Sequence, residues 1–342
     1  MKILVVGSKK DWAFENHYLK HLKPLCSKVE TFAAHDMFYD YYYKSIVNKL
    51  LFRSRFSSIY KTINKNLLSH LDENKYDVVW VFKGMEIFPE TLVKMKKRGI
   101  KLVNLNPDHP FVHTFRGSGN KNVLNSIPHF DLHLCYNLNV KKKIEDTFGV
   151  WCEWLPFGFE RRDYDSFPTE DTELKRCCFI GNPDAFRAQV LLKIAESGLP
   201  LDLYGNNWNQ WVRPKEGLDI NYNEPVYKSD FDKVALKYRL HLNIFRPHND
   251  NSHNMRTFEM PGIGCIILAP NSEEHQLLFK EDKEVFYYST DEEMLSKASK
   301  ILALDYSDAL EIRNRCREVS KERGYDYESR AKEALLYFTK LL

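Results

Sequence analysis

The chain has 342 residues, which is long for one hydrophobic core and suits two domains of ordinary size. Its hydrophobic content of 43 % is ample for globular cores, and its formal net charge of +3 argues against a general nucleic-acid binder. The seven cysteines are odd in number, show no CxxC spacing and mostly lie in apolar runs, so we expect reduced thiols and neither a disulfide framework nor a zinc site.

The first residues, MKILVVGS, hold too short an apolar run for a signal peptide and predict a first strand. No apolar run approaches the roughly 20 residues that a membrane-spanning helix needs. We therefore expect a cytoplasmic protein whose only membrane contact would be peripheral, on the inner face.

Strand-like apolar runs alternate with helical periodicity in the first half of the chain, which predicts parallel α/β layers. The runs are continuous, as in strands that are covered on both faces. The predicted strands are 2–7, 29–33, 76–82, 101–106, 131–136 and 151–155, and a helix is predicted over 12–25.

A polar stretch with two prolines, 156–172, predicts a linker, after which the alternation restarts. The predicted strands of the second half are 177–181, 201–205, 241–245 and 265–269, and the predicted helices are 185–197, 228–238, 294–302 and 328–342.

The stretch 253–270 carries the most chemistry. A polar turn that ends at Asn254 leads into a helix, whose N-terminus suits a phosphate, and Arg256 would add a forked cation there. Glu259 would add an acceptor suited to sugar hydroxyls, and Pro261 is expected to kink or end the helix. The alternative is an ordinary capped helix with Arg256 and Glu259 paired on its surface.

An ordered series of segments strengthens the functional interpretation. The segments are CCFIGN with Arg187, LPLDLYGNNW, HLNIF, NMRTFEMPGIGCIILAP, FKEDKEVFYYSTDEEML and YDYESRAKE. Together they resemble the C-terminal domain of GT-B glycosyltransferases, most closely those of the spore-maturation-protein type. The resemblance implies an α/β fold of two Rossmann-like, doubly wound parallel-sheet domains that face a cleft. It further implies an acceptor domain over 1–156, a linker over 157–172, a donor domain over 173–325 and a final helix, 326–342, that crosses back to the first domain.

Doubly wound sheets bind ligands at the carboxyl ends of their strands. Gly181 and Asn182 follow one predicted strand, with Arg187 one turn into the next helix, and Gly205 and Trp208 follow another. With the helix at 256–259, these ends can surround a nucleotide diphosphate.

The resemblance also implies individual roles. Glu259 matches the family's acidic residue that holds the ribose hydroxyls, while Arg187 and Arg256 are the diphosphate candidates. Trp208 or Tyr227 would line the base pocket, although Trp208 is equally interpreted as a core aromatic. Common retaining members carry a second glutamate eight residues before the first, where this chain has Asn251, so retention or inversion stays open.

The segments KGMEIFPETL and NLNPDHP resemble the family's first domain. Lys83, Glu86, Asp108 and His109 follow its strands, and Gly7 with Ser8 at the first strand end is a further place for acceptor contacts. Asp108 or His109 could take a proton from an acceptor hydroxyl. The alternative for Asp108 is that it caps or orients its loop.

We expect no cofactor and no metal. The pairs Asp163/Asp165 and Asp230/Asp232 have DxD spacing but fall in the linker and on a surface helix, so we discount them as metal ligands. Positive side chains and a helix N-terminus would stabilise the departing diphosphate instead.

Residues 38–68 hold six basic residues against one acid, Asp40, interleaved with aromatic and aliphatic side chains. This pattern suits a membrane surface or an anionic acceptor such as a lipid diphosphate, and nucleic-acid binding uses the same ingredients. The alternative is an ordinary amphipathic helix with a solvated basic face.

The first hypothesis is a bacterial-type, metal-independent glycosyltransferase. It would move a sugar from a nucleotide diphosphate, of the UDP or GDP type, to a cell-surface glycan, glycolipid or protein. A nucleotide-sugar epimerase or hydrolase and a non-catalytic nucleotide-sugar-binding protein are the rivals, since a fold alone does not decide among them.

Overall fold

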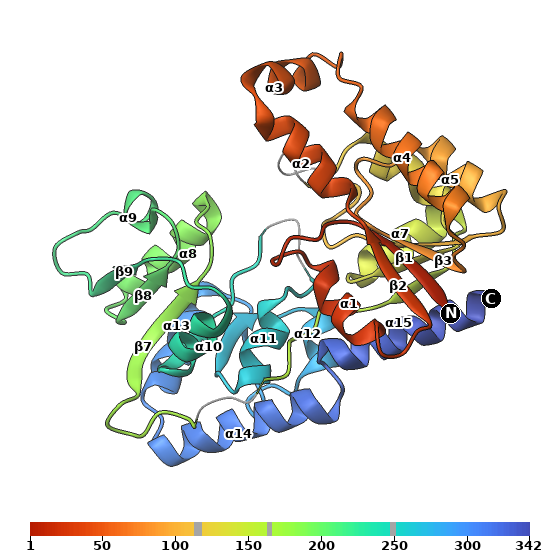
Figure 1. Ribbon diagram of the computed structural model, residues 1–342. Coiled ribbons are helices and arrows are strands. Elements are labelled where there is room, and N and C mark those ends of the chain that lie inside the picture. The colour runs from red at the N-terminus through yellow and green to blue at the C-terminus, as the bar shows by residue number, and fades with distance from the viewer. Residues whose placement is uncertain (113–117, 163–165, 247–250) are drawn as a thin grey trace. The chain divides into compact units, whose positions relative to one another are not determined.

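The computed structural model describes residues 1–112, 118–162, 166–246 and 251–342 (Figure 1). It divides into two compact units. Unit 1 comprises Met1–Pro156 and Tyr327–Leu342, and unit 2 comprises Phe157–Asp326. Each unit is built on its own six-stranded parallel sheet.

The sheet of unit 1 has the strand order β2-β1-β3-β4-β5-β6, with every pair parallel. Because β2 lies on one side of β1 and β3 on the other, the chain reverses its direction of winding between β1 and β3. The strands are β1 (Lys2–Val6), β2 (Lys28–Phe32), β3 (Val78–Phe82), β4 (Lys101–Leu105), β5 (Leu132–Cys135) and β6 (Cys152–Trp154).

Helices cover both faces of this sheet, as the continuous apolar runs predict. Ile3 and Val5 of β1 face a core that includes Trp80 and Phe338, whereas Leu4 faces a second core on the opposite side. The helices are α1 (Glu15–Leu22), α2 (Ala34–Lys44), α3 (Ile46–Arg53), α4 (Ile59–Glu73), α5 (Pro89–Lys96), α6 (Lys121–Ser126), the short η1 (Ile127–His129), α7 (Leu138–Phe148) and α15 (Tyr327–Leu341). In Figure 1, α2 and α3 project from the rest of unit 1.

The sheet of unit 2 has the order β12-β11-β10-β7-β8-β9, which is the doubly wound arrangement with its reversal between β7 and β10. The strands are β7 (Leu174–Ile180), β8 (Leu201–Tyr204), β9 (Ile220–Asn223), β10 (Tyr238–Leu242), β11 (Ile267–Pro270) and β12 (Phe286–Tyr288). The helices are α8 (Ala185–Glu196), α9 (Trp208–Trp211), α10 (Lys228–Leu236), α11 (Arg256–Ile263), α12 (Glu273–Leu278), α13 (Asp291–Leu302) and α14 (Tyr306–Glu322). The predicted class of two doubly wound parallel-sheet domains is thus confirmed.

Helix α11 does not end at Pro261, contrary to one of the two expected outcomes. It continues to Ile263 and ends at Gly264, whose φ of +90° is left-handed. The amide of Gly264 donates to the Pro261 carbonyl (2.9 Å) and that of Cys265 to the Met260 carbonyl (2.8 Å). These two hydrogen bonds form a Schellman motif, so the helix ends at Gly264.

The described part of 157–172 belongs to unit 2 and packs within it. Phe159 is buried, and its amide donates to the carbonyl of Tyr325 (3.1 Å). A methyl group at Gly262 would lie 2.5 Å from the Phe159 ring, so the glycine permits this contact. Among the described residues, no helix is both long and apolar enough to cross a membrane.

Candidate functional site

The carboxyl ends of β7, β8 and β10 lie at one edge of the unit 2 sheet, around its reversal point. Gly205, which follows β8, has a φ of +150°, and a methyl group there would lie 2.3 Å from the Gly181 carbonyl oxygen. Only glycine fits such an approach, so the ends of β7 and β8 meet closely. The predicted pair Gly181 and Gly205 is therefore brought together.

Arg187, in the first turn of α8, connects the ends of β7 and β10. Its Nε and one terminal nitrogen donate to the Ile244 carbonyl (3.3 Å each), and its other terminal nitrogen donates to the Asn182 carbonyl (3.0 Å). Since a guanidinium carries five N–H groups, two remain for a ligand. Asp184 caps α8 by accepting the Arg187 amide (3.0 Å), which fixes where the side chain begins.

Positive charge accumulates at this edge. Arg246, which follows β10, has its Nε 3.6 Å from Asp184 Oδ2, and Arg187 Nε is equally distant from that oxygen. Burial lowers the pKa of Arg187 to about 10, and the charges of Arg246 and Arg256 add to the shift, although Asp184 opposes it. The three guanidinium groups outnumber the two neighbouring carboxylates, Asp184 and Glu259, so an anion would stabilise this site.

Arg256 and Glu259 form an ion pair one turn apart on α11, as the alternative interpretation of this helix expected. Arg256 also lies over the ring of Phe231 at 4.3 Å, and its Nε is 3.5 Å from the Ile180 carbonyl at the end of β7. Among the described residues, the second oxygen of Glu259 and the third nitrogen of Arg256 have no hydrogen-bond partner. The pair can therefore meet a ligand without being broken.

Asn254 is used by the protein itself. Its side chain accepts the amide of Thr257 (3.2 Å) and donates to Asn243 Oδ1 (2.7 Å). Thr257 in turn lies 2.9 Å from Nε2 of the buried His275. Asn254 thus caps α11 and connects it to the residue after β10, which fixes the position of Arg256 in the first turn of the helix.

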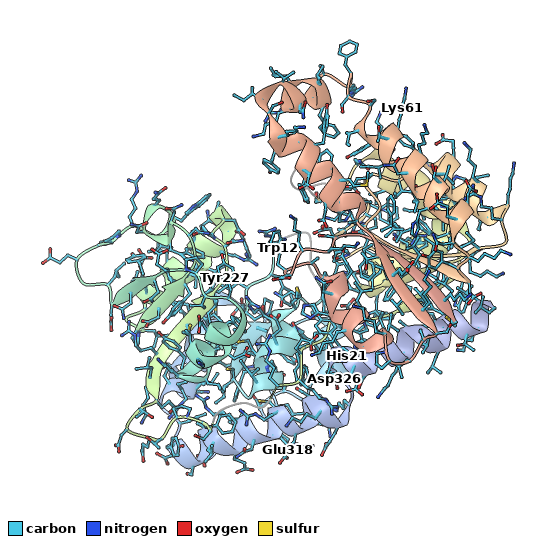
Figure 2. The ribbon with its side chains drawn as sticks, viewed as in Figure 1. Trp12, His21, Lys61, Tyr227, Glu318 and Asp326 are labelled. Carbon is cyan, nitrogen blue, oxygen red and sulfur yellow. The ribbon has the colours of Figure 1, made fainter. Side chains whose placement is uncertain are left out.

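The two aromatic candidates lie in different surroundings. Trp208 is 1 % exposed, packs in the unit 2 core, and its indole N–H donates to the Gly181 carbonyl (2.9 Å). Tyr227, which precedes α10, is 67 % exposed and is labelled in Figure 2. The placement of Trp208 favours its interpretation as a core aromatic that supports the strand end.

In unit 1, the turn after β1 is held by two carboxylates. The Ser8 amide donates to Glu15 Oε1 (2.5 Å), and the Ser8 hydroxyl donates to Asp36 Oδ1 (2.6 Å). A methyl group at Gly7 would lie 2.1 Å from the same Glu15 oxygen, so a larger residue there would displace the Glu15 side chain. The Glu15 and Asp36 carboxylates thus hold the Ser8 turn in place.

The catalytic candidates follow β4. Asp108 forms an ion pair with Lys83 (2.5 Å), and its amide donates to Asn106 Oδ1 (3.0 Å). His109 Nδ1 accepts the amide of Phe111 (3.2 Å), which leaves the proton of a neutral ring on Nε2. Asp108 therefore orients its loop through its amide, and its carboxylate is paired with Lys83. His109 can donate a hydrogen bond through Nε2.

Among the residues that the structure describes, no group of three or more His, Cys, Asp or Glu side chains is arranged to hold a metal. Asp163 and Asp165 lie outside the described residues. Asp232 forms an ion pair with Arg162, and Asp230 is exposed on α10.

Comparison with known proteins identifies this architecture. Residues 187–335 match the model of a glycosyl transferase-like family. The fold matches that of Anabaena Alr3699/HepE in complex with UDP-glucose, at a TM-score of 0.69 and 12 % identity, over 99 % of this chain and 100 % of that one. The chain has the GT-B fold, and part of it, residues 187–335, is similar to the glycosyl transferase-like family.

Two further solved structures are similar over the full length. The E. coli structure described as trehalose-6-phosphate bound with UDP-2-fluoro glucose has a TM-score of 0.66 at 11 % identity, over 100 % of both chains. The UDP-GlcNAc 2-epimerase of Neisseria meningitidis, bound to UDP-GlcNAc, has a TM-score of 0.56 at 13 % identity, over 99 % of this chain and 100 % of that one. A search of curated proteins gives no match.

The GT-B fold also brings in residues that the sequence did not single out. In unit 2 these are Asp184 and Arg246, which are ordinary polar residues until the strand ends place them beside Arg187. In unit 1, His35 Nδ1 lies 2.7 Å from Oε2 of the buried Glu86, which was predicted. Burial opposes a charge on His35, but the Glu86 carboxylate outweighs it, so the pKa of His35 is raised. In the sequence, the one feature that could have indicated His35 is its position shortly after the strand β2.

Proposed function

We propose that this GT-B protein is a glycosyltransferase that takes its sugar from a nucleotide diphosphate. The observation that carries the proposal is the convergence of Arg187, Arg246 and Arg256 at the reversal point of the unit 2 sheet, with Glu259 beside them. A diphosphate complements the guanidinium groups, and the second oxygen of Glu259 suits ribose hydroxyls. Gly181, Asn182, Gly205 and Tyr227 would complete the surroundings of the nucleotide.

The donor that we propose is of the UDP type, with GDP as the alternative. Support comes from the similar structures, which are complexes with UDP-glucose, UDP-2-fluoro glucose and UDP-GlcNAc. Charge develops on the departing diphosphate in the transition state, and preorganised cations stabilise that charge more than they stabilise the bound donor. The arginines would thus perform the task that a metal ion performs elsewhere.

For the proton of the acceptor hydroxyl, we propose Asp108, with Lys83 fixing its orientation and His109 as a neighbouring donor. Gly7, Ser8 and Glu86 would contribute acceptor contacts. The acceptor would be a cell-surface glycan, glycolipid or protein. Contact with a membrane surface is supported by the exposed apolar residues of α3 and the basic residues around them.

The test is a transfer assay with radiolabelled UDP-sugars and a panel of acceptors, run with and without a chelator. We expect transfer that persists in EDTA, because arginines replace the metal. Asp108→Asn should lower kcat by roughly 100-fold or more, the range of one general base. Transfer that stops in EDTA and returns with magnesium would contradict metal independence.

An epimerase is the second candidate, because the Neisseria meningitidis 2-epimerase shares the fold. An epimerase needs no acceptor. Turnover of the donor to an isomeric nucleotide sugar, with no acceptor present, would favour it over transfer.

A further inference from the structure

A large pocket opens in unit 1 beneath the α2–α3 hairpin. Its volume is about 850 Å³, and it is lined by α2, α3, the start of α4 and the loops that follow β3 and precede α6. Six of its residues are aromatic: Phe38, Tyr39, Tyr42, Tyr43, Phe52 and Tyr60. Glu86 is the one residue among the lining that belongs to the proposed acceptor contacts.

The aromatic wall is held by its own packing. Phe38 and Phe52 have ring centroids 4.8 Å apart, and Tyr60 lies 5.4 Å from Phe52. The hairpin is fixed where Ser45 caps α3 by accepting the Asn48 amide (3.1 Å). The wall is therefore a built surface rather than a set of loose side chains, and aromatic rings of this kind accept apolar chains and sugar faces.

Three cations surround the pocket: Lys49, Arg53 and Arg55. Within the described residues, none of them has a carboxylate within 4.0 Å. Lys49 instead lies 4.9 Å from the centroid of the Tyr43 ring. Cations that have no carboxylate partner and lie beside an aromatic wall favour an anionic ligand, because an anion would supply the missing counter-charge.

The pocket also has one buried carboxylate. Glu86 is 4 % exposed, its Oε2 lies against His35, and its backbone carbonyl accepts a hydrogen bond from Asn64 (2.7 Å). Asn120 lines the same region and donates to the Met85 carbonyl (2.8 Å). A hydroxyl-bearing group that entered the pocket would meet an oriented acceptor here.

Apart from Asn48, the residues of α3 that do not line the pocket are apolar and exposed. Ile46 is 75 % exposed, Val47 61 % and Leu50 58 %, and Phe56 beyond the helix is 82 % exposed. The helix buries none of its residues, so its apolar side has no partner within the described chain. The cations thus lie next to a surface that suits an acyl or isoprenoid chain.

We propose that this pocket binds the acceptor, and that the acceptor is an amphiphile with a phosphate group, such as a lipid-linked sugar phosphate. The inference rests on the proposed glycosyl transfer. The phosphate meets Lys49, Arg53 and Arg55, the apolar chain follows α3, and a sugar hydroxyl meets Glu86. Two exposed arginines allow a test that leaves folding intact.

The experiment is calorimetric titration of the full chain with farnesyl phosphate, held below its micelle concentration, with farnesol and inorganic phosphate as separate arms. We expect farnesyl phosphate to bind at least tenfold more tightly than either of the others. The double substitution Arg53→Gln with Arg55→Gln should weaken it tenfold or more. Lys61→Gln with Lys65→Gln is the matched control on α4, where both side chains are exposed and neither lines the pocket, and it should change affinity less than twofold (Figure 2 labels Lys61).

Equal binding of farnesol would overturn the role of the cations, and equal binding of inorganic phosphate would overturn the role of the aromatic wall. An equal loss in the control would reduce the effect to general surface charge. A single-stranded oligonucleotide that binds more tightly than farnesyl phosphate would identify a nucleic-acid site instead. UDP titrated into the same variants separates the two proposals: absent UDP binding in the wild type contradicts the donor site, whereas retained UDP binding with unchanged farnesyl phosphate binding contradicts only the pocket.

Discussion

Several side chains at the sheet edges form hydrogen bonds with the backbone of the strand ends and of the helix that follows. Arg187 donates to two strand ends, Asn254 caps α11, and Trp208 supports Gly181. Most of the hydrogen bonds of these side chains hold the backbone in place. Two N–H groups of Arg187 and the second carboxylate oxygen of Glu259 remain for a ligand. Such preorganisation lets a site stabilise charge without rearranging.

His35 gives a prediction at this scale. Because the Glu86 carboxylate raises its pKa, the charged ring contributes stability that is fully present below the unfolded pKa of about 6.5 and is lost as the pH rises through the folded value. An NMR titration of the His35 ring should give a pKa above 6.5. In Glu86→Gln burial and the charge of Lys83 are opposed by the Glu15 carboxylate alone, so the pKa should fall to 6.5 or below. A wild-type pKa under 6.5, or one unchanged in Glu86→Gln, would disprove the coupling.

The secondary-structure elements show where sequence patterns are sufficient. The strands at 76–82 and 101–106 are confirmed within two residues, because their apolar runs are unbroken. Helix α14 was not predicted, since its buried face includes Arg313 and Ser320 in place of apolar residues. Strand β10 begins at Tyr238, three residues earlier than predicted, because the buried Arg239 interrupts the apolar run. The edge strands β9 and β12 are three or four residues long and carry too little pattern to detect.

The buried Arg313, which interrupts the apolar pattern of α14, also holds this helix in place. The carboxylate of Glu173 is fully buried and binds two buried arginines, with Oε2 2.8 Å from Arg239 Nε and Oε1 2.7 Å from Arg313 Nη2. The arginines also donate to the carbonyls of Leu304 and Tyr238 (2.6 Å each). These contacts join β10, α13 and α14 through charge rather than through apolar packing.

We predict that Glu173→Ala lowers the free energy of unfolding by about 3–5 kcal/mol, because it leaves two buried cations without a counter-charge. Chemical denaturation followed by circular dichroism measures the change. Asp291→Ala, which removes an exposed partner of Lys193, is the control and should cost about 0–1 kcal/mol. Equal effects of the two substitutions would show that the buried triad does not stabilise the unit.

For the whole molecule, the two sheets each reverse their winding at one point, and the candidate residues gather there. The sequence located the strand ends and most of the polar residues on them. It could not show that Asp184 and Arg246 join Arg187, nor that the aromatic residues of 38–68 line a pocket, since both depend on how separate elements pack against one another.

The chain returns to unit 1 at its C-terminus. Phe338 of α15 is fully buried and lies 5.1 Å from the Trp80 ring, and Tyr327 packs against Tyr18 (5.7 Å). A chain truncated after Asp326 should therefore expose Trp80 and shift tryptophan emission to longer wavelength. Truncation by two residues, at Lys340, is the control. Unshifted emission in the longer truncation would mean that α15 is dispensable for the core of unit 1.

The central claim is that unit 2 binds a nucleotide diphosphate through the arginines at its sheet edge, and calorimetric titration with UDP tests it most directly. Arg256→Gln removes one charge-assisted contact worth about 1.5–3 kcal/mol, so the account predicts a loss of affinity of roughly tenfold or more. Arg315→Gln, on the exposed face of α14, should bind like the wild type. Wild-type affinity in Arg256→Gln, or an equal loss in Arg315→Gln, would contradict the account.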